Sequence, residues 1–168
     1  MDKVHRPKPP VFSFTAFSGT GKTTYIEKLV PLLKQAGLQV GVIKHDAHDF
    51  EVDYPGKDTW RFTQAGADKV SIGSGTHFAL MVARELAFEE ITALRADMDI
   101  ILSEGYRAHH ARFIGVFREA AGLRPALPLE DMFAAVTDTP LSAPPLQFPL
   151  HDAQPLAEFL VRFLKDNQ

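Results

Sequence analysis

The stretch that most constrains this chain lies at residues 11–24, where an apolar run is followed by Ser-Gly-Thr-Gly-Lys-Thr-Thr. A strand, a glycine-rich loop and a helix in this order form a phosphate-binding loop, or P-loop. The glycines let successive backbone N–H groups curl around an anion, and the helix directs its unpaired N–H groups at the same phosphates. The sequence therefore predicts a nucleotide-binding protein, with contacts from Ser18, Gly19, Thr20, Gly21, Lys22, Thr23 and Thr24.

Two residues of this loop have specific expected roles. Lys22 would reach the outer phosphates as a catalytic residue, and the Thr23 hydroxyl would be a ligand of Mg²⁺. Ala16 replaces the first glycine of the usual pattern. That position closes the strand, so a methyl group fits if φ is negative. The alternative is a glycine turn that happens to carry Lys-Thr and binds nothing.

The composition is that of an ordinary globular protein. The 168 residues, 45% of them hydrophobic, fit one nucleotide-binding domain over residues 11–168, preceded by a flexible tail at residues 1–10. The net charge of −3 provides no basic field for non-specific nucleic-acid binding. The chain has no cysteine, which excludes disulfides and thiolate metal sites and fits a reducing compartment. No signal peptide or membrane-spanning run is recognisable, so we expect a cytoplasmic protein with no membrane partner.

The apolar periodicity alternates between strands and helices. It predicts an α/β, P-loop NTPase-like three-layer fold with a mostly parallel central sheet, helices on both faces and an extra β-hairpin. The segment at residues 140–149 contains four prolines and is expected to be irregular. After the first strand, further strands are expected at residues 39–44, 98–105, 113–117 and 134–136, the hairpin at 69–73 and 78–83, and helices at 22–36, 57–66, 85–96 and the C-terminus.

A second informative stretch is the apolar strand at residues 98–105, which ends in Glu104 and Gly105. A central parallel strand that delivers a carboxylate at its tip matches the Walker-B arrangement. Glu104 would face Thr23 across Mg²⁺, directly or through water, or act as a catalytic base. Gly105 would let the backbone approach the terminal phosphate. The alternative for Glu104 is a strand-end cap or surface acid, and Arg107 either contacts phosphate or a partner or is simply exposed.

The loop at residues 44–58 is dense in ionisable groups and follows the end of the second strand, where ligands of open α/β sheets bind. Asp53 and Asp58 are candidates for holding Mg²⁺ or its waters; the alternatives are exposed loop charge and helix capping. His45, His48 and Lys57 are expected to contact the nucleotide or a partner. A polar loop with no site role is the second reading for the histidines, and a transition-metal site completed by His109 and His110 is the third.

Asp138 follows the predicted strand at residues 134–136. In P-loop GTPases a carboxylate near this strand tip accepts hydrogen bonds from the N–H groups of guanine. The Asn-Lys that usually precedes it is missing here. Asp138 is therefore either a guanine ligand or a residue that caps a helix or turn.

Taken together, the motifs resemble the MobB family, the molybdopterin-guanine dinucleotide biosynthesis adapter proteins. The resemblance rests on Ser-Gly-Thr-Gly-Lys-Thr-Thr at 18–24, Lys-His-x-x-His-Asp at 44–49, Asp-x-Pro-Gly-Lys-Asp at 53–58, Ala-Gly-Ala at 65–67 and Glu-Gly-Tyr-Arg at 104–107.

The resemblance implies a GTP-binding homodimer with Mg²⁺ and at most slow GTPase activity. It would assist the guanylyltransferase that joins GMP to molybdopterin, and molybdopterin itself is a possible ligand. One alternative is a small-molecule kinase, which needs an arginine-rich lid; Arg107, Arg112 and Arg118 are scattered, with no obvious lid helix. The other is a metallochaperone GTPase that uses the histidines.

Overall fold

The computed structural model describes residues 8–46, 50, 52–106 and 111–167. The chain divides into two compact units. The larger unit contains Met1–His45 and Thr92–Gln168, and the smaller unit contains Asp46–Ile91. The prediction of a single domain over residues 11–168 stays a prediction.

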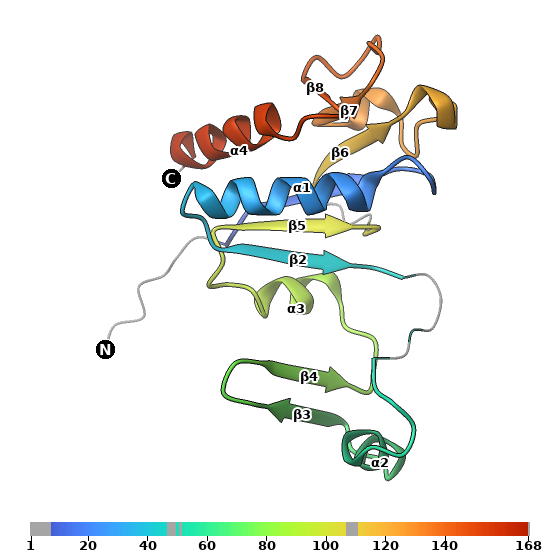
Figure 1. Cartoon of the computed structure of the whole chain (residues 1–168), viewed down its shortest axis with the longest axis vertical. Helices are drawn as coiled ribbons and strands as arrows, with labels where there is room; N and C mark the ends of the chain where they lie inside the picture. Colours follow the sequence, from blue (N-terminus) through green and yellow to red (C-terminus); the bar gives the residue numbers. More distant parts are fainter. Residues whose placement is uncertain (1–7, 47–49, 51, 107–110, 168) are drawn as a thin grey trace. The chain divides into compact units, whose positions relative to one another are not determined.

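The larger unit is built on a parallel six-stranded sheet (Figure 1). Every pairing of neighbouring strands in it is parallel. Parallel strands require crossover connections, and their carboxyl ends gather at one edge of the sheet, where α/β proteins bind ligands. The strand order is β2 (Val40–Lys44), β5 (Ile100–Glu104), β1 (Val11–Thr15), β6 (Arg112–Phe117), β7 (Ala134–Thr137) and β8 (Gln147–Pro149).

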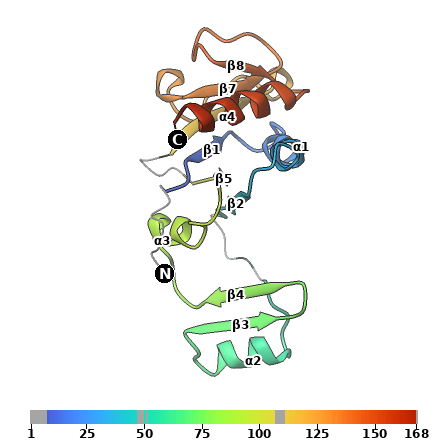
Figure 2. The same cartoon turned by 90° about the vertical axis from the view of Figure 1, so that its left-hand side faces the viewer.

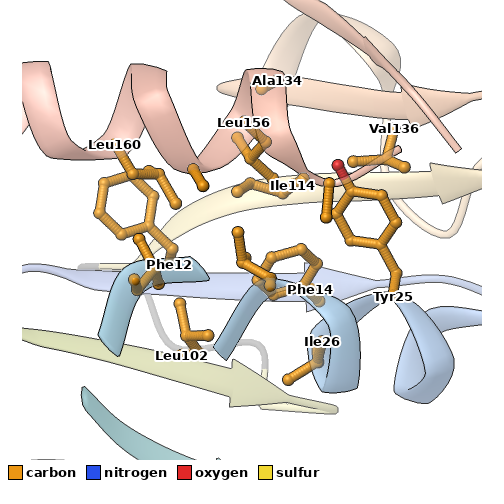
Figure 3. Packing of buried hydrophobic residues seen from close by; sticks show 14 of the residues in the cluster. Phe12, Phe14, Tyr25, Ile26, Leu102, Ile114, Ala134, Val136, Leu156 and Leu160 are labelled. Atoms are coloured by element: carbon orange, nitrogen blue, oxygen red, sulfur yellow. The ribbon is translucent and has the colours of Figure 1, made fainter. Parts of the chain in front are cut away.

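Two helices, α1 (Lys22–Gln35) and α4 (Gln154–Asp166), pack against each other on one face of this sheet. Figure 3 shows the buried side chains between them and the strands. Phe12 and Phe14 of β1 are fully buried there, together with Leu160 of α4. Burial of large apolar side chains stabilises the fold by about 1.5–3 kcal/mol each, so this layer fixes the position of β1 and α1.

Along β7 the side chains alternate between the two faces of the sheet. Ala134 and Val136 belong to the core under α1 and α4, whereas Ala135 belongs to a smaller cluster with Phe117 and Met132. A period of two is the geometry of a strand buried on both sides. The second face is covered here by the segment between β6 and β7, which contains two 3₁₀ turns, η1 (Glu119–Ala121) and η2 (Leu129–Asp131).

The smaller unit contains helix α2 (Asp58–Gln64) and an antiparallel hairpin of β3 (Lys69–Gly73) and β4 (Phe78–Val82). Figure 2 shows α2 packed beside the hairpin. Several large apolar side chains of the hairpin are exposed to solvent, namely Ile72, Phe78 and Leu80. The chain returns to the larger unit within the short helix α3 (Phe88–Ala93).

The predicted α/β fold with a mostly parallel sheet and an extra hairpin is confirmed. Two elements differ from the sequence-based expectation. Residues 147–149 form the edge strand β8 inside the proline-rich segment, because an edge strand pairs on one side only and tolerates Pro149. The helix expected at 85–96 is shorter, since the Glu90 carboxylate accepts the Ala87 N–H and binds Arg84 in the preceding turn. Within the described residues, no helix is long and apolar enough to cross a membrane.

Candidate nucleotide-binding site

The loop between β1 and α1 has the backbone conformation of an anion cradle. Gly19 has a φ of 82° and Gly21 a φ of 93°, and both values lie in the left-handed region that favours glycine. No non-glycine residue in the described part of the chain has a positive φ. Ala16 therefore meets the condition that the missing first glycine imposes.

Helix α1 presents an open N-terminus to this loop. Its N-cap is Gly21, which supplies no side-chain cap, and its first turn has no acidic residue. The first backbone N–H groups of a helix have no partner within the helix, and the positive end of the dipole favours an anion. The Thr20 hydroxyl instead donates to the Phe17 carbonyl at 3.1 Å, which closes the loop on itself. The N–H groups at the start of α1 are thus available to a phosphate.

Lys22 and Thr23, the first residues of α1, both face Glu104 at the tip of β5. The Thr23 hydroxyl donates to the Glu104 Oε1 and Oε2 atoms at 3.0 and 3.2 Å. The Lys22 Nζ atom lies 3.7 Å from Glu104 Oε1, and the two side chains are only 18% and 14% exposed. The sequence motifs at 18–24 and 98–105 therefore meet in one place, and the binding roles expected of Lys22, Thr23 and Glu104 stay predictions.

The oxygen atoms of this cluster suit Mg²⁺. Hydroxyl and carboxylate oxygens are its preferred protein ligands, with substrate phosphates and water completing the shell. Thr23 and Glu104 converge from two elements of the larger unit and would hold the ion, which would supply positive charge to the phosphates.

The backbone around Glu104 is held from two sides. The His45 N–H donates to the Glu104 carbonyl at 2.8 Å, and the buried Ser13 hydroxyl donates to the Tyr106 carbonyl at 2.6 Å. Gly105 has a φ of 90°, and a Cβ there would lie 2.9 Å from the His45 carbonyl oxygen. The His45 ring packs 4.6 Å from the Tyr106 ring, measured between centroids. In the structure, the missing side chain of Gly105 makes room for His45; its approach to phosphate stays a prediction.

Asp138 lies directly after β7, and its carboxylate already has a hydrogen-bond partner. Its Oδ1 atom accepts the Glu119 N–H at 2.8 Å, which ties the start of η1 to the end of β7. This is the turn-capping role that the sequence left open. A hollow of about 230 Å³ opens beside it between residues 137–140 and 147–149.

The other predicted ligands of Mg²⁺ belong to the smaller unit. Asp53 Oδ1 accepts the Tyr54 N–H at 2.8 Å, whereas Asp58 lies 3.6 Å from Arg61 in an exposed ion pair. Lys57 is the N-cap of α2. The contacts observed for Asp53 and Asp58 are with residues close in sequence, and Lys57 begins α2. The part of all three residues in the site stays a prediction. The predicted residues His48 and Arg107 lie outside the described residues.

The structure also places two arginines at the loop, a role that the sequence pattern did not indicate. The Arg118 guanidinium reaches Gly21, and the Arg124 guanidinium lies 5.0 Å from the centre of the Phe17 ring. Arg112 by contrast packs over the rings of Phe12 and Phe163 in the core layer. No spacing in the sequence signals these contacts, because they depend on which strands are neighbours in the sheet.

The third alternative for the histidines is a transition-metal site. Within the ranges that the structure describes, no three His, Cys, Asp or Glu side chains gather closely enough to hold a metal ion. His48, His109 and His110 fall outside those ranges.

The first strand of the parallel sheet runs through a glycine loop into an uncapped helix, and the adjacent strand contributes a carboxylate. This arrangement defines a P-loop NTPase-like protein. The family described as "Molybdopterin guanine dinucleotide synthesis protein B" (MobB) matches residues 11–138. The chain belongs to the MobB family of molybdopterin-guanine dinucleotide biosynthesis adapter proteins.

Individual relatives agree with this assignment. The molybdopterin-guanine dinucleotide biosynthesis adapter protein of Escherichia coli (strain K12) is 37% identical over 164 residues, which cover 93% of this chain and 94% of the relative. The protein of the same name from Haemophilus influenzae is 29% identical over 160 residues, or 92% and 89% of the two chains. The crystal structure of Bacillus subtilis MobB has a TM-score of 0.69 at 23% identity, over 92% of this chain and 97% of that one, and supports the fold.

Proposed function

We propose that this protein binds GTP together with Mg²⁺ and assists the guanylyltransferase that attaches GMP to molybdopterin. The observation that carries the proposal is the meeting of Lys22, Thr23 and Glu104 beside an open helix N-terminus. Such a site suits a phosphate chain and its metal ion. The assignment to molybdopterin-guanine dinucleotide synthesis rests on the family and on the name of the Escherichia coli relative.

The base preference is proposed to depend on Asp138. The carboxylate lies after β7, at the edge of the sheet that also carries the loop after β1, and the hollow beside it would receive a planar base. A carboxylate accepts from two neighbouring N–H groups, which guanine offers and adenine does not. Because Oδ1 already accepts the Glu119 N–H, guanine would share that oxygen or bind mainly to Oδ2.

Hydrolysis is proposed to be slow. A general base must be free to take a proton from water. The Glu104 carboxylate accepts the Thr23 hydroxyl with both oxygens, and its Oε1 atom lies 3.7 Å from the Lys22 ammonium, so the carboxylate is engaged by protein groups and is not free for an attacking water. This arrangement suits a protein that holds GTP more than one that consumes it.

Partner contacts are proposed for the loops at the same edge of the sheet. His45 is exposed, and its ring packs at a tilt against the Tyr106 ring, two residues beyond Glu104, so a partner that touches these rings would contact the edge of the nucleotide site. Lys57, His48 and Arg107 remain candidates for phosphate or partner contact. Molybdopterin is proposed as a ligand of the complex with the guanylyltransferase.

A homodimer through the hairpin is also proposed. Ile72, Phe78 and Leu80 expose apolar surface, and each of the two strands has one unpaired edge. Exposed apolar side chains next to unpaired strand edges mark an interaction site. Phe78→Glu should shift the protein to a monomer in sedimentation velocity, whereas Phe62→Glu, an exposed aromatic of α2, should not. A monomeric wild-type protein would refute the proposal.

The central experiment is calorimetric titration with GTP and ATP in the presence of Mg²⁺. Lys22→Ala should weaken GTP binding at least about 100-fold. Hydrogen bonds to charged groups contribute about 1.5–3 kcal/mol, and the substitution also removes the positive charge of the Lys22 ammonium from the phosphates. Lys28→Ala, a substitution of an exposed lysine on the same helix, is the control and should bind GTP as the wild type does.

Asp138→Asn should lower the ratio of GTP to ATP affinity in the same titrations. An unaltered ratio would show that Asp138 does not recognise the base.

The adapter role has its own assay. The purified protein is added to a molybdenum cofactor guanylyltransferase, and the transfer of GMP to molybdopterin is measured. Transfer should increase with the wild-type protein and not with Lys22→Ala. Equal stimulation by both would separate the adapter role from nucleotide binding.

A further inference from the structure

Arg118 reaches the phosphate loop from the neighbouring strand. It follows β6 directly, and β6 pairs in parallel with β1 so that Thr15 lies opposite Gly115. The two strands therefore end side by side, and the residue after β6 arrives beside the loop that follows β1. A Cβ placed on Gly21 would lie 2.8 Å from the Arg118 Nη2 atom. The guanidinium is thus in contact with the residue that precedes Lys22.

The backbone that carries Arg118 is fixed. Arg118 is extended, with a φ of −131°, and it is the N-cap residue of η1. The next N–H group, that of Glu119, donates to Asp138, and the Thr139 hydroxyl donates to the Glu119 carboxylate at 3.1 Å. The end of β7 therefore holds the segment from which the arginine extends.

Within the described ranges, the Arg118 guanidinium lacks a hydrogen-bond acceptor. Among the residues that the structure describes, it makes no hydrogen bond or ion pair, and its Nε atom is buried. Leaving a charged donor away from water without an acceptor costs free energy, and an orphaned buried donor calls for an explanation. If Arg118 served to hold the loop in shape, its donors would bond to loop carbonyls, and no such bond is present.

A second arginine from the same segment also contacts the loop. Arg124 lies over the ring of Phe17, which is a loop residue that is 45% exposed. The segment at residues 118–124 therefore flanks the loop with two guanidinium groups. Guanidinium groups match phosphate oxygens with paired N–H donors and stay charged at every physiological pH.

We propose that Arg118 binds the phosphate chain of the nucleotide in this loop, as a second cation beside Lys22. The inference rests on the proposed nucleotide binding and adds the residue that completes the phosphate site. Lys22 is neutralised in part by Glu104, which lies 3.7 Å away, whereas Arg118 keeps its full charge for the ligand. Nucleotide binding would thereby join β1, β5 and β6 at one edge of the sheet.

The test compares GTP and inorganic tripolyphosphate, which has the phosphates and lacks the base. Arg118→Gln should weaken the binding of both by about 10- to 100-fold, the effect expected for charge-assisted hydrogen bonds. Arg162→Gln is the control, since it removes the same charge from an exposed position on α4, and it should bind both ligands within about twofold of the wild type. A loss for GTP with tripolyphosphate unaffected would overturn the proposal, because Arg118 would then act on the base or ribose.

Failure of this inference is separable from failure of the proposed function. If the wild-type protein and Lys22→Ala bind GTP equally poorly, nucleotide binding itself is wrong. If Lys22→Ala loses GTP while Arg118→Gln binds as the wild type does, only the assignment of Arg118 is wrong. Thermal melting checks the fold of each variant. Arg118→Met, which keeps most of the apolar stem, provides the same measurement if the glutamine variant does not fold.

Discussion

The Thr23 hydroxyl lies 3.0 and 3.2 Å from the two carboxylate oxygens of Glu104, although 81 positions separate the residues in the sequence. The contact joins the start of α1 to the tip of β5. It follows from the parallel pairing of β1 and β5, which brings Phe14 opposite Glu104. Mg²⁺ between nucleotide and protein would use these two groups.

Removal of the Thr23 hydroxyl should abolish the effect of Mg²⁺ on nucleotide binding. For the wild type, we expect GTP to bind about 10-fold more tightly with Mg²⁺ than with a chelator, or about 1.4 kcal/mol. Thr23→Val keeps the shape of the side chain and should bind GTP almost equally in both conditions. Calorimetric titrations with and without the chelator measure this. A Thr23→Val protein that retains the full effect of Mg²⁺ would show that the ion is held elsewhere.

Ser13 and Ser103 should respond in opposite ways to substitution by alanine. They are paired residues on β1 and β5, and both are fully buried. The Ser13 hydroxyl donates to Tyr106, whereas the Ser103 hydroxyl has no partner among the described residues. Ser13→Ala should lower the free energy of unfolding by about 1 kcal/mol, and Ser103→Ala should leave it unchanged or raise it. Chemical denaturation compares the two; equal losses would contradict the difference in hydrogen bonding.

Gly105→Ala should destabilise the protein more than a change at an equally left-handed glycine. The alanine would pay about 1–2 kcal/mol for a φ of 90° and would also approach the His45 carbonyl oxygen to 2.9 Å. Gly37→Ala is the matched control, because its φ is 87° and no atom lies within 4 Å of the new Cβ. We expect Gly105→Ala to unfold at lower denaturant concentration than Gly37→Ala. Similar midpoints would mean that the chain at His45 moves away freely.

The core of the candidate site could be predicted from the sequence because its determinants are local. Gly19, Gly21 and Lys22 lie within four residues, and the physics of glycine and of a helix N-terminus gives them their roles. The meeting with Glu104 required one further step, the rule that parallel strands end at a common edge.

Arg118 could not be found in this way. Its contact with Gly21 depends on β6 being the neighbour of β1, and no spacing in the sequence encodes that order. Strand β8 was missed for a similar reason, because its pairing with β7 is a long-range interaction inside a segment whose prolines indicate irregular structure. The amide of Gln147, which bonds to the backbone of Leu141 and Pro144, organises that segment and has no recognisable motif.

Tyr25 should make the stability of the protein fall at alkaline pH. The side chain is 1% exposed and lies in the core between α1 and the sheet, as Figure 3 shows. Burial, and secondly the negative charge of Asp152, raise the pKa of its hydroxyl well above the ordinary value. The folded state thus keeps the proton at pH values where the unfolded chain has lost it. The contribution of the Tyr25 hydroxyl to the free energy of unfolding is therefore fully present below the unfolded pKa of about 10 and is lost as the pH rises above it.

The Tyr25→Phe variant should therefore lose less stability than the wild type between about pH 9 and pH 11. At neutral pH the variant should unfold with nearly the wild-type free energy, because the Tyr25 hydroxyl lies 3.5 Å from its acceptor, the Asp152 carbonyl, and that bond is weak. Tyr54→Phe is the control, since Tyr54 is 76% exposed, and it should follow the wild-type curve. Urea unfolding across this range measures all three proteins, and parallel curves for wild type and Tyr25→Phe would show that Tyr25 ionises in the folded state as it does in the unfolded chain.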